Sequence, residues 1–490
     1  MTNARGKVSP LRGPEQIFLG GKWTVPSGVE AFDVVDATTE EPFQRLPLAN
    51  GTDVSAAIGA ARHAFDLGPW PRMRHGERAE YLRRFAQEIR ARADQIQQVY
   101  PRETGVLYAF AQGMTSAAAQ AWDYYADLGD TYEFETSAAP TAGGDLGLLV
   151  REPVGVVGAI VPWNSPIVTI AYKLAPALIA GCTVILKAST EAPIEAYIMA
   201  EIADDIGLPE GVFNMLVADR EVSEILVRDP RVDKITFTGS TAAGRRIASL
   251  CGDRIARTTL ELGGKSAALI LDDADIEAAA AALSASSCAI SGQVCSALTR
   301  IIVPRPRHDD LLAALASNAA AVQLGDPFDD ATQMGPLAVE RQRDRVESFV
   351  ARGIEEGATL AAGGRRPQQL ARGWFIEPTV FGNVDNASTL ATEEIFGPVL
   401  SVIPADSEDH AIELANDSIY GLNASVFTPD PDRALSVARR LRTGTVGHNS
   451  FRSDFGVSFG GFKQSGIGRE GGREGIASFL ETKYIILDEK

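Results

Sequence analysis

The clearest pattern in the sequence is an alternation of short apolar runs and longer amphipathic stretches between residues 154 and 250. The apolar runs lack polar alternation, which is typical of strands buried on both faces of a parallel sheet. They cover residues 154–161, 183–187, 212–216 and 234–238, and the helices expected between and after them cover 170–179, 192–206, 221–227 and 241–250. Repeated strand–helix–strand units predict an α/β fold with a doubly wound parallel sheet, whose ligand should bind at the carboxyl ends of the strands.

A second run of the same kind follows. It predicts strands at 266–271 and 299–303 and helices at 275–288 and 308–322, and the segments that continue the pattern are 375–381, 399–403, 409–416 and 433–442. No internal repeat or low-complexity tract interrupts the chain. The second run therefore predicts a further α/β unit beside the first.

The first 130 residues show a different pattern of predicted elements, with short strands followed by helices. Short strands are expected at 16–19 and 32–35, and helices at 52–68, 77–100 and 115–130, with Thr52 or Asp53 capping the first and Pro101 breaking the second. A hairpin then follows, with strand-like runs at 131–136 and 146–153 and a turn between them. An exposed strand pair is a natural subunit contact, and the strand-like end of the segment 477–487 could pair with it.

Length and composition narrow the function. A chain of 490 residues is too long to fold around a single hydrophobic core, so its length suggests about three domains or lobes. The net charge of -18 argues against binding nucleic acid or an acidic membrane surface. The sequence shows no signal peptide and no apolar stretch long enough to span a bilayer, so we expect a cytoplasmic protein.

Cysteine and histidine usage argues against disulfides and zinc. The four cysteines form no C-x-x-C pair, and the five histidines are scattered. Cys182, Cys251 and Cys288 are interpreted as core residues. No metal site is therefore predicted.

One cysteine suggests chemistry. Cys295 lies among small residues in the segment 284–300, where a substrate carbon could approach the thiol. Upstream, Glu261 stands between two leucines and ahead of two glycines. Our hypothesis is that Cys295 is a nucleophile and Glu261 the base that serves it, although a small buried thiol is the commoner fate of a cysteine.

Other polar positions follow the predicted strands. The segment Gly239–Gly244 opens a helix and could bind phosphate with its N–H groups, or could simply cap the helix. Asn164 could donate to an oxyanion or could be a turn residue, and Lys187 could bind ribose or phosphate or be solvated. The G-x-G-x-x-G match at 466–471 follows no clear strand, and the segment 263–266 lacks the first glycine of a P-loop.

Together these residues resemble the aldehyde dehydrogenase superfamily, from about residue 15 to the end of the chain. The matching motifs are Pro162–Asn164, Lys187–Ser189, Phe237–Thr241, Leu260–Lys265, Gly292–Cys295, Glu393–Pro398, Asn449 and Phe459–Gly466. The resemblance implies a Rossmann-like cofactor-binding domain (1–129 and 151–259), an α/β catalytic domain (260–470), and a small β oligomerisation flap with the C-terminal tail (130–150 and 471–490). It also implies a homodimer or homotetramer.

The resemblance further implies oxidation of an aldehyde to a carboxylic acid with reduction of NAD(P)+. Cys295 would attack as thiolate, Asn164 and the Cys295 N–H would hold the oxyanion, and Glu261 would activate water to hydrolyse the thioester. Lys173, and Glu470 with it, match positions implicated in proton relay. The positions implied to bind the cofactor are Trp163, Lys187, Thr190, Gly239, Ser240, Gly263, Glu394 and Phe396, with Lys187 and Glu394 at the riboses, Ser240 at the pyrophosphate and Phe396 at the nicotinamide.

This plan makes two electrostatic demands. A free thiol has a pKa of about 8.5, so local donors should lower the pKa of Cys295. A carboxylate flanked by leucines should have its pKa raised by desolvation, which suits a base.

Two departures from the family pattern bear on specificity. The family often has Glu three residues after the ribose-binding Lys, where this chain has Thr190 followed by Glu191. Thr190 does not repel a 2′-phosphate as a carboxylate would, so NADP stays an alternative. Glu191 and the acidic net charge favour NAD. Ser165 and Ala289 are small where relatives often have aromatics, which suggests a roomier pocket for bulky apolar or aromatic aldehydes.

Three alternatives stay open. They are a CoA-acylating dehydrogenase, which Glu261 disfavours; a Cys-dependent esterase or amidase, for which His448 is the nearest candidate partner; and a non-catalytic homologue, against which the intact Cys295, Glu261 and Asn164 argue.

Overall fold

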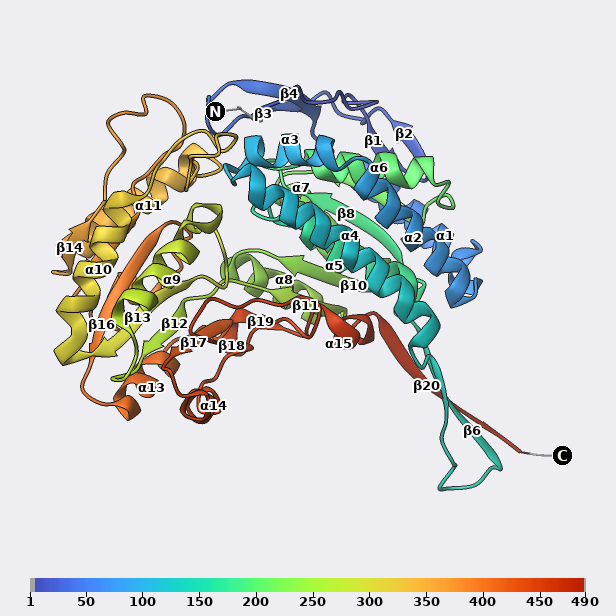
Figure 1. Cartoon of the computed structure of the whole chain (residues 1–490). Helices are drawn as coiled ribbons and strands as arrows, with labels where there is room; N and C mark the ends of the chain where they lie inside the picture. Colours follow the sequence, from blue (N-terminus) through green and yellow to red (C-terminus); the bar gives the residue numbers. More distant parts are fainter. Residues whose placement is uncertain (1–4, 489–490) are drawn as a thin grey trace.

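The computed structural model describes residues 5–488. Two large sheets, each covered by helices, form the body of the molecule, and a thin β arm projects from it (Figure 1). The first sheet has eight strands in the order β19-β11-β10-β7-β8-β9-β1-β2, and the second has seven in the order β14-β15-β16-β13-β12-β17-β18. The predicted α/β class with a Rossmann-like sheet is confirmed.

The first sheet carries the early part of the candidate site. Its strands are β1 (Ile17–Leu19), β2 (Lys22–Thr24), β7 (Val156–Ile160), β8 (Thr183–Ala188), β9 (Phe213–Val217), β10 (Lys234–Thr238), β11 (Arg257–Glu261) and β19 (Gly466–Ile467). The five central strands are parallel, whereas β1 and β19 join antiparallel. Strands β7 and β9 are buried along their whole length, as their apolar sequences predict.

Eight helices of the N-terminal half pack around this sheet. They are α1 (Gly51–Asp66), α2 (His75–Ala91), α3 (Ala93–Thr104), α4 (Tyr108–Thr131), α5 (Pro166–Ala180), α6 (Ile194–Asp205), α7 (Arg220–Arg228) and α8 (Thr241–Asp253). The long apolar cluster around α2, α4 and α5 makes the main core of this half.

Two boundary predictions in this half are wrong. Asn50, and neither Thr52 nor Asp53, is the N-cap of α1, because its side chain accepts from two backbone N–H groups while the Asp53 carboxylate binds the Asn50 N–H in a capping box. Pro101 does not end the helical run, since α3 continues to Thr104 and ends at Gly105 in the left-handed region with φ 76°. Every residue of that last turn is buried, so packing outweighs the hydrogen bond that proline cannot make.

The second sheet continues the candidate site. Its strands are β12 (Ser266–Ile270), β13 (Leu298–Pro304), β14 (Thr359–Ala362), β15 (Thr379–Gly382), β16 (Val399–Ala405), β17 (Asn423–Phe427) and β18 (Thr445–His448). The helices around it are α9 (Ile276–Cys288), α10 (His308–Ala321), α11 (Glu340–Glu355), α12 (Thr389–Thr392), α13 (Glu408–Asn416) and α14 (Pro431–Ala438). Of the segment 375–381, only the end enters a strand, β15.

The arm is a three-stranded sheet of β5 (Glu135–Ser137), β6 (Leu146–Pro153) and β20 (Leu480–Leu487). Strand β20 pairs antiparallel with β6 from Leu480 opposite Pro153 to Leu487 opposite Leu146, so the predicted pairing of the C-terminal segment is confirmed. The predicted strand 131–136 is shorter than expected, because α4 runs on to Thr131. In Figure 1 the arm extends well away from both sheets.

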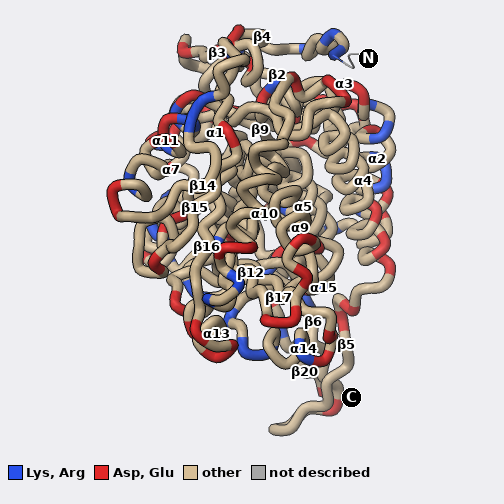
Figure 2. The backbone as a smooth tube through the Cα atoms, turned by 60° about the vertical axis from the view of Figure 1, so that its left-hand side comes forward, with Lys and Arg blue, Asp and Glu red and all other residues tan. Residues whose placement is uncertain are grey.

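Three smaller elements complete the description: the hairpin β3 (Ala31–Val35) and β4 (Pro42–Pro47), and α15 (Gly472–Ala477). Strand β19 brings the C-terminal part of the chain back to the first sheet beside β11. No helix within residues 5–488 is long and apolar enough to cross a lipid bilayer. In Figure 2 several acidic positions, coloured red, lie along the outer edge of the molecule near α4, in keeping with the net charge of -18. The division into three named domains stays a prediction.

Candidate active site

Cys295 lies in a sharp connection between the short 3-10 turn η2 (Ala289–Gly292) and β13. Within this turn Ile290 and Ser291 have left-handed φ values of 47° and 53°. Non-glycine residues in that region are strained and persist only where their surroundings hold them. A Cβ added at Gly264 would lie 2.4 Å from the Cys295 carbonyl oxygen, which explains a glycine there. The half-buried thiol thus sits on a backbone held from both sides.

Asn164 lies beside the segment that carries Cys295. It follows β7, it is buried, and its Nδ2 donates to the Gln293 carbonyl oxygen over 2.8 Å. Its own carbonyl oxygen accepts from the Tyr100 hydroxyl over 2.8 Å. The structure therefore brings the predicted amide donor and the predicted nucleophile onto adjoining segments.

Glu261 is the last residue of β11 and is only 4% exposed. Neither of its carboxylate oxygens has a hydrogen-bond partner among the described residues. Burial raises the pKa of Glu261 well above its ordinary value, the neighbouring Glu470 raises it further, and Lys173 opposes the rise. The expected direction of the shift is confirmed, and a buried carboxyl group without partners can accept a proton.

Lys173 and Glu470 form a buried ion pair next to Glu261. Lys173 Nζ donates to Glu470 Oε1 and, over 3.2 Å, to Thr236 Oγ1. The Thr236 hydroxyl in turn donates to Glu470 Oε1 over 3.1 Å. Lys173 is fully buried, so a neighbouring carboxylate compensates the cost of its charge. This cluster joins α5, β10 and the segment before α15.

The electrostatics of Cys295 differ from expectation. Burial, followed by the charges of Glu394 and Glu261, raises the pKa of the Cys295 thiol to about 12, and the N–H groups of Ser296 and Cys295 oppose this only in part. The expectation that local donors lower this pKa is therefore wrong for the protein as described. Two carboxylates near a buried thiol favour its neutral form.

The predicted cofactor positions on the first sheet lie at the carboxyl ends of its parallel strands or just after them. Half-buried Lys187 lies near the end of β8, where burial lowers its pKa and Glu191 and Asp219 oppose the effect. Ser240 caps α8, its side chain accepting from the Ala243 N–H over 3.3 Å. The Gly239 N–H donates to the Glu261 carbonyl oxygen over 3.0 Å. The helix-cap interpretation of Ser240 is thus realised in the structure.

Thr190 stands two residues after β8, half-buried, and its neighbour Glu191 is engaged. The Glu191 carboxylate accepts from Ser189 Oγ and pairs with Arg341 in the first turn of α11. This ion pair joins a loop of the first sheet to a helix of the second, and no motif or spacing predicts it.

A second group of predicted cofactor residues surrounds Glu394. Its Oε1 accepts from the Gly264 N–H over 3.2 Å, and burial raises its pKa to about 7. A Cβ at Gly263 would lie 2.2 Å from Glu394 Oε2, so this carboxylate needs the glycine beneath it. The rings of Trp163 and Phe396 meet edge to face at 5.4 Å. These residues come from the loop after β7, the turn between β11 and β12, and the segment before β16.

Other candidates fall elsewhere. His448 Nε2 lies 2.9 Å from the Thr428 carbonyl oxygen and 3.1 Å from Asn449 Nδ2, so its ring is engaged away from Cys295. Cys182, Cys251 and Cys288 are free and buried, as predicted. Within residues 5–488 no group of three or more His, Cys, Asp and Glu side chains could hold a metal ion.

Sequence reasoning assigned no role to several residues that hold this arrangement. They are Tyr100, Thr236, Gln293, Arg341 and Gln342. Gln293 stands inside the motif that carries Cys295, which was the only available signal. The others touch the site through contacts between segments far apart in the chain, and no spacing pattern reveals such contacts.

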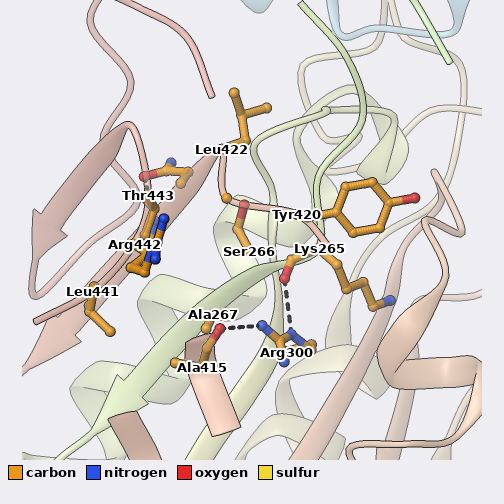
Figure 3. Close-up of a pocket in the computed structure, with 13 residues that line it drawn as sticks. Lys265, Ser266, Ala267, Arg300, Ala415, Tyr420, Leu422, Leu441, Arg442 and Thr443 are labelled. Atoms are coloured by element: carbon orange, nitrogen blue, oxygen red, sulfur yellow. Dashed lines mark hydrogen bonds between the residues drawn. The ribbon is translucent and has the colours of Figure 1, made fainter. Parts of the chain in front are cut away.

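A small cavity lies behind the start of β12 and β13 and does not include Cys295 (Figure 3). Arg300 beside it donates to the carbonyl oxygens of Lys265 and Ala415, drawn as dashes, and the Lys265 ammonium points away from Arg300. Arg300 thereby fixes the strand that follows the nucleophile, and we assign the cavity no ligand.

The ends of parallel strands and the loops beside them bring together a thiol, an amide and a buried carboxyl group, which is an arrangement typical of an enzyme site in an α/β fold. Residues 23–485 match the model of the aldehyde dehydrogenase family. The chain belongs to the aldehyde dehydrogenase family. The predicted class, an NAD(P)-dependent aldehyde dehydrogenase, is therefore confirmed.

Individual relatives agree over nearly the whole chain. It is 43% identical over 474 residues to the geranial dehydrogenase of Castellaniella defragrans, covering 96% of this chain and 98% of the relative. The aldehyde dehydrogenase of Mycobacterium tuberculosis in complex with NAD+ superposes with a TM-score of 0.94 at 43% identity, covering 96% and 98% of the two chains. Aldehyde dehydrogenase C of Pseudomonas syringae, a mutant in complex with NAD+ and octanal, superposes with a TM-score of 0.93 at 38% identity, covering 99% and 98%.

Proposed function

We propose that the protein oxidises an aldehyde to a carboxylic acid through a thiohemiacetal and a thioester on Cys295. The observation that carries the proposal is the contact of Asn164 Nδ2 with the Gln293 carbonyl oxygen, two residues before the thiol. Glu261 is buried at the end of β11, without a hydrogen-bond partner among residues 5–488, and its charge acts on the Cys295 thiol. A nucleophile, an oxyanion donor and a base would then act together.

Each residue has one chemical task in this proposal. The thiolate adds to the carbonyl carbon, and the Asn164 amide and the Cys295 N–H stabilise the oxyanion. NAD(P)+, when bound, supplies the hydride acceptor. Glu261 then takes a proton from the water that attacks the thioester, and the carboxylic acid leaves as the thiol re-forms. Lys173 and Glu470 pass that proton away from Glu261.

The cofactor would lie along the strand ends, between the two sheets. Lys187 and Glu394 would bind the riboses and Ser240 the pyrophosphate, with Thr190, Gly239 and Gly263 beside them. Trp163 and Phe396 would bound the nicotinamide. We propose NAD as the preferred cofactor and NADP as an alternative, because Thr190 leaves room for a 2′-phosphate while the acidic Glu191 disfavours one.

The substrate class proposed is a bulky apolar or aromatic aldehyde. Phe455 stacks on Phe459 with ring centroids 4.0 Å apart, and Tyr172, one residue before Lys173, lies tilted against Phe455 at 5.0 Å, which makes an aromatic cluster. Ser165 and Ala289 are small and half-buried. The relatives named for geranial and crystallised with octanal support this class. We further propose a cytoplasmic homodimer or homotetramer joined through the β arm.

Absorbance of NADH or NADPH during incubation with a panel of aldehydes tests the proposal. Geranial, octanal and benzaldehyde should each reduce NAD, whereas acetaldehyde should react more slowly. The variant Cys295→Ala should abolish the signal and still bind cofactor. Turnover that requires CoA would replace the proposal with an acylating dehydrogenase, and no reduction with any aldehyde would refute it.

A further inference from the structure

Gln293 is the most fully engaged polar side chain near the candidate nucleophile. It is completely buried, and its amide makes bonds to three separate segments. Nε2 donates to the Ile290 carbonyl oxygen over 2.9 Å and to the Thr104 carbonyl oxygen over 3.4 Å, and Oε1 accepts from the Ala338 N–H over 3.0 Å. One side chain therefore ties the nucleophile's own turn to the end of α3 and to the segment before α11.

The turn that Gln293 closes needs such support. Ile290 and Ser291 both lie in the left-handed region, which is strained for residues other than glycine and persists only where neighbouring groups hold it. The Ser291 hydroxyl lies within hydrogen-bond distance of the carbonyl oxygens of Gly335 and Pro336, at 2.8 and 3.0 Å, in the segment that also supplies the Ala338 N–H. The strained turn is thus clamped from one side by two neighbouring side chains.

The main chain of Gln293 acts on the opposite side. Its carbonyl oxygen accepts one N–H of the Asn164 amide. An amide nitrogen carries two N–H groups, so this bond fixes the amide plane and leaves the second N–H to donate to an oxyanion. Asn164 is held from behind as well, because the Tyr100 hydroxyl donates to its carbonyl oxygen.

We propose that Gln293 is a positioning residue that sets the Cys295 thiol and the Asn164 amide at a fixed separation. In this role Gln293 touches neither substrate nor cofactor. It acts on the Cys295 thiol through the backbone of the turn, and on the Asn164 amide through the hydrogen bond that its carbonyl oxygen accepts. The inference rests on the proposed function, since it assigns Gln293 to the covalent step of that reaction. Small displacements of reacting groups reduce rates by about 100-fold, so the loss of this support should appear in the chemical step.

The test is a double-mutant cycle in the full-length enzyme. Gln293→Met keeps the length and burial of the side chain and removes all three hydrogen bonds. We expect it to lower kcat by roughly 10- to 100-fold with little change in the dissociation constant of NAD. Asn164→Ala should lower kcat by about 100- to 1000-fold. The double variant should be little slower than Asn164→Ala alone, because both changes remove the same geometry.

A matched control and a second readout separate positioning from general stability. Asn214→Leu removes another completely buried amide, one that donates to the carbonyl oxygens of Val184 and Gly211, and it should show no coupling to Asn164→Ala. The pH profile of Cys295 alkylation by iodoacetamide should shift in Gln293→Met and stay unchanged in Asn214→Leu. If Gln293→Met does not fold, Gln293→Asn, which keeps the amide on a shorter stem, takes its place.

The outcomes are distinct. Independent, multiplicative losses in the double variant would overturn the inference, as would a Gln293→Met enzyme with unchanged kcat or with a cofactor affinity reduced as much as kcat. If the wild-type enzyme oxidises no aldehyde, the proposed function fails, and the alkylation profile still decides whether Gln293 positions the thiol.

Discussion

At the scale of single residues, the side chains around Cys295 determine the pKa of its thiol. Cys295 lies near two acidic side chains, Glu394 and Glu261, and both raise its pKa. Burial raises this pKa most, so the neutral thiol is favoured over the thiolate. Thiolates rather than thiols react with alkylating agents and oxidants, so a change in this pKa should appear as a change in the alkylation rate.

The first residue-level prediction concerns Glu394. Replacing it with Gln removes a negative charge next to the thiol and should lower the pKa of Cys295. At a pH well below that pKa, each unit of decrease gives about ten times more thiolate, so alkylation by iodoacetamide at pH 8 should be severalfold faster. Rates are measured on cofactor-free enzyme. Glu393→Gln changes the adjacent exposed carboxylate and should have no effect; equal acceleration by both variants would contradict the prediction.

The second concerns Glu261. Its pKa is raised, so at low pH the folded protein holds it protonated and it cannot accept a proton from water. Turnover should therefore rise with pH as Glu261 ionises. Glu261→Gln should keep a pre-steady-state burst of NADH and lose most steady-state turnover, by roughly 100-fold or more. Stopped-flow absorbance separates the two phases. Unchanged turnover in this variant would sink the assignment of Glu261 as the base.

At the level of elements, α3 connects the site to the core of the first half. Tyr100 and Thr104 on its last turn hold Asn164 and Gln293, and Glu103 between them lies against Glu195 of α6. Both glutamates are fully buried, and within residues 5–488 only Glu103 Oε1 accepts a hydrogen bond, from the Ile194 N–H over 3.1 Å. Burial raises the pKa of Glu195 to about 7 and that of Glu103 well above its ordinary value. Ionising this pair should loosen α3 from α6.

This gives a stability prediction with a defined sign. Glu195 binds its proton more tightly folded than unfolded, so its protonated form stabilises the fold, and that contribution is lost as pH rises from about 4.5 to about 7. Glu195→Gln should remove the loss and raise Tm by a few degrees at pH 8, with a smaller effect at pH 5. Thermal melts at both values check it. Glu201→Gln on the same helix breaks an ion pair with Arg92 and should lower Tm at pH 8 instead.

Local patterns predict some of these elements and miss others. The uninterrupted apolar run 154–161 identified β7, and the antiparallel partner of the C-terminal segment followed from two strand-like sequences. Helix α11 was not predicted from the sequence, because charged residues occupy most of its exposed face. The motifs brought Cys295, Asn164 and Glu261 together by resemblance, whereas their electrostatics could not be inferred, since the pKa of Cys295 depends on distances to carboxylates far away in the sequence.

On the scale of the whole molecule, the β arm of β5, β6 and β20 projects away from the two large sheets (Figure 1). Tyr484, Ile486 and Leu487 on β20 are 41%, 50% and 49% exposed, and β20 is an edge strand. Exposed apolar edges are unfavourable in an isolated chain and are commonly covered by another one. The arm therefore suits contact with a second copy.

The oligomer prediction follows from that surface. Tyr484→Glu combined with Ile486→Asp places two charges on the exposed arm and should shift the protein toward the monomer by several-fold in apparent dissociation constant. Light scattering coupled to gel filtration measures the mass. Leu435→Asp, a change at a leucine 52% exposed on α14, is the control and should leave the mass unchanged. A wild-type monomer, or equal dissociation by the control, would show that the arm does not mediate assembly.

The pairing of Lys173 with Glu470 also has a consequence for the order in which the protein matures on the ribosome. These partners are 297 positions apart, and strand β19 just before Glu470 completes the edge of the first sheet. Synthesis proceeds from the N-terminus, so the early sheet emerges with a lysine that has no counter-ion and an edge that lacks its last strand. A nascent chain can therefore collapse early and still lack a finished catalytic centre until β19 and Glu470 have been added. Premature termination late in the message should yield a folded-looking but inactive protein.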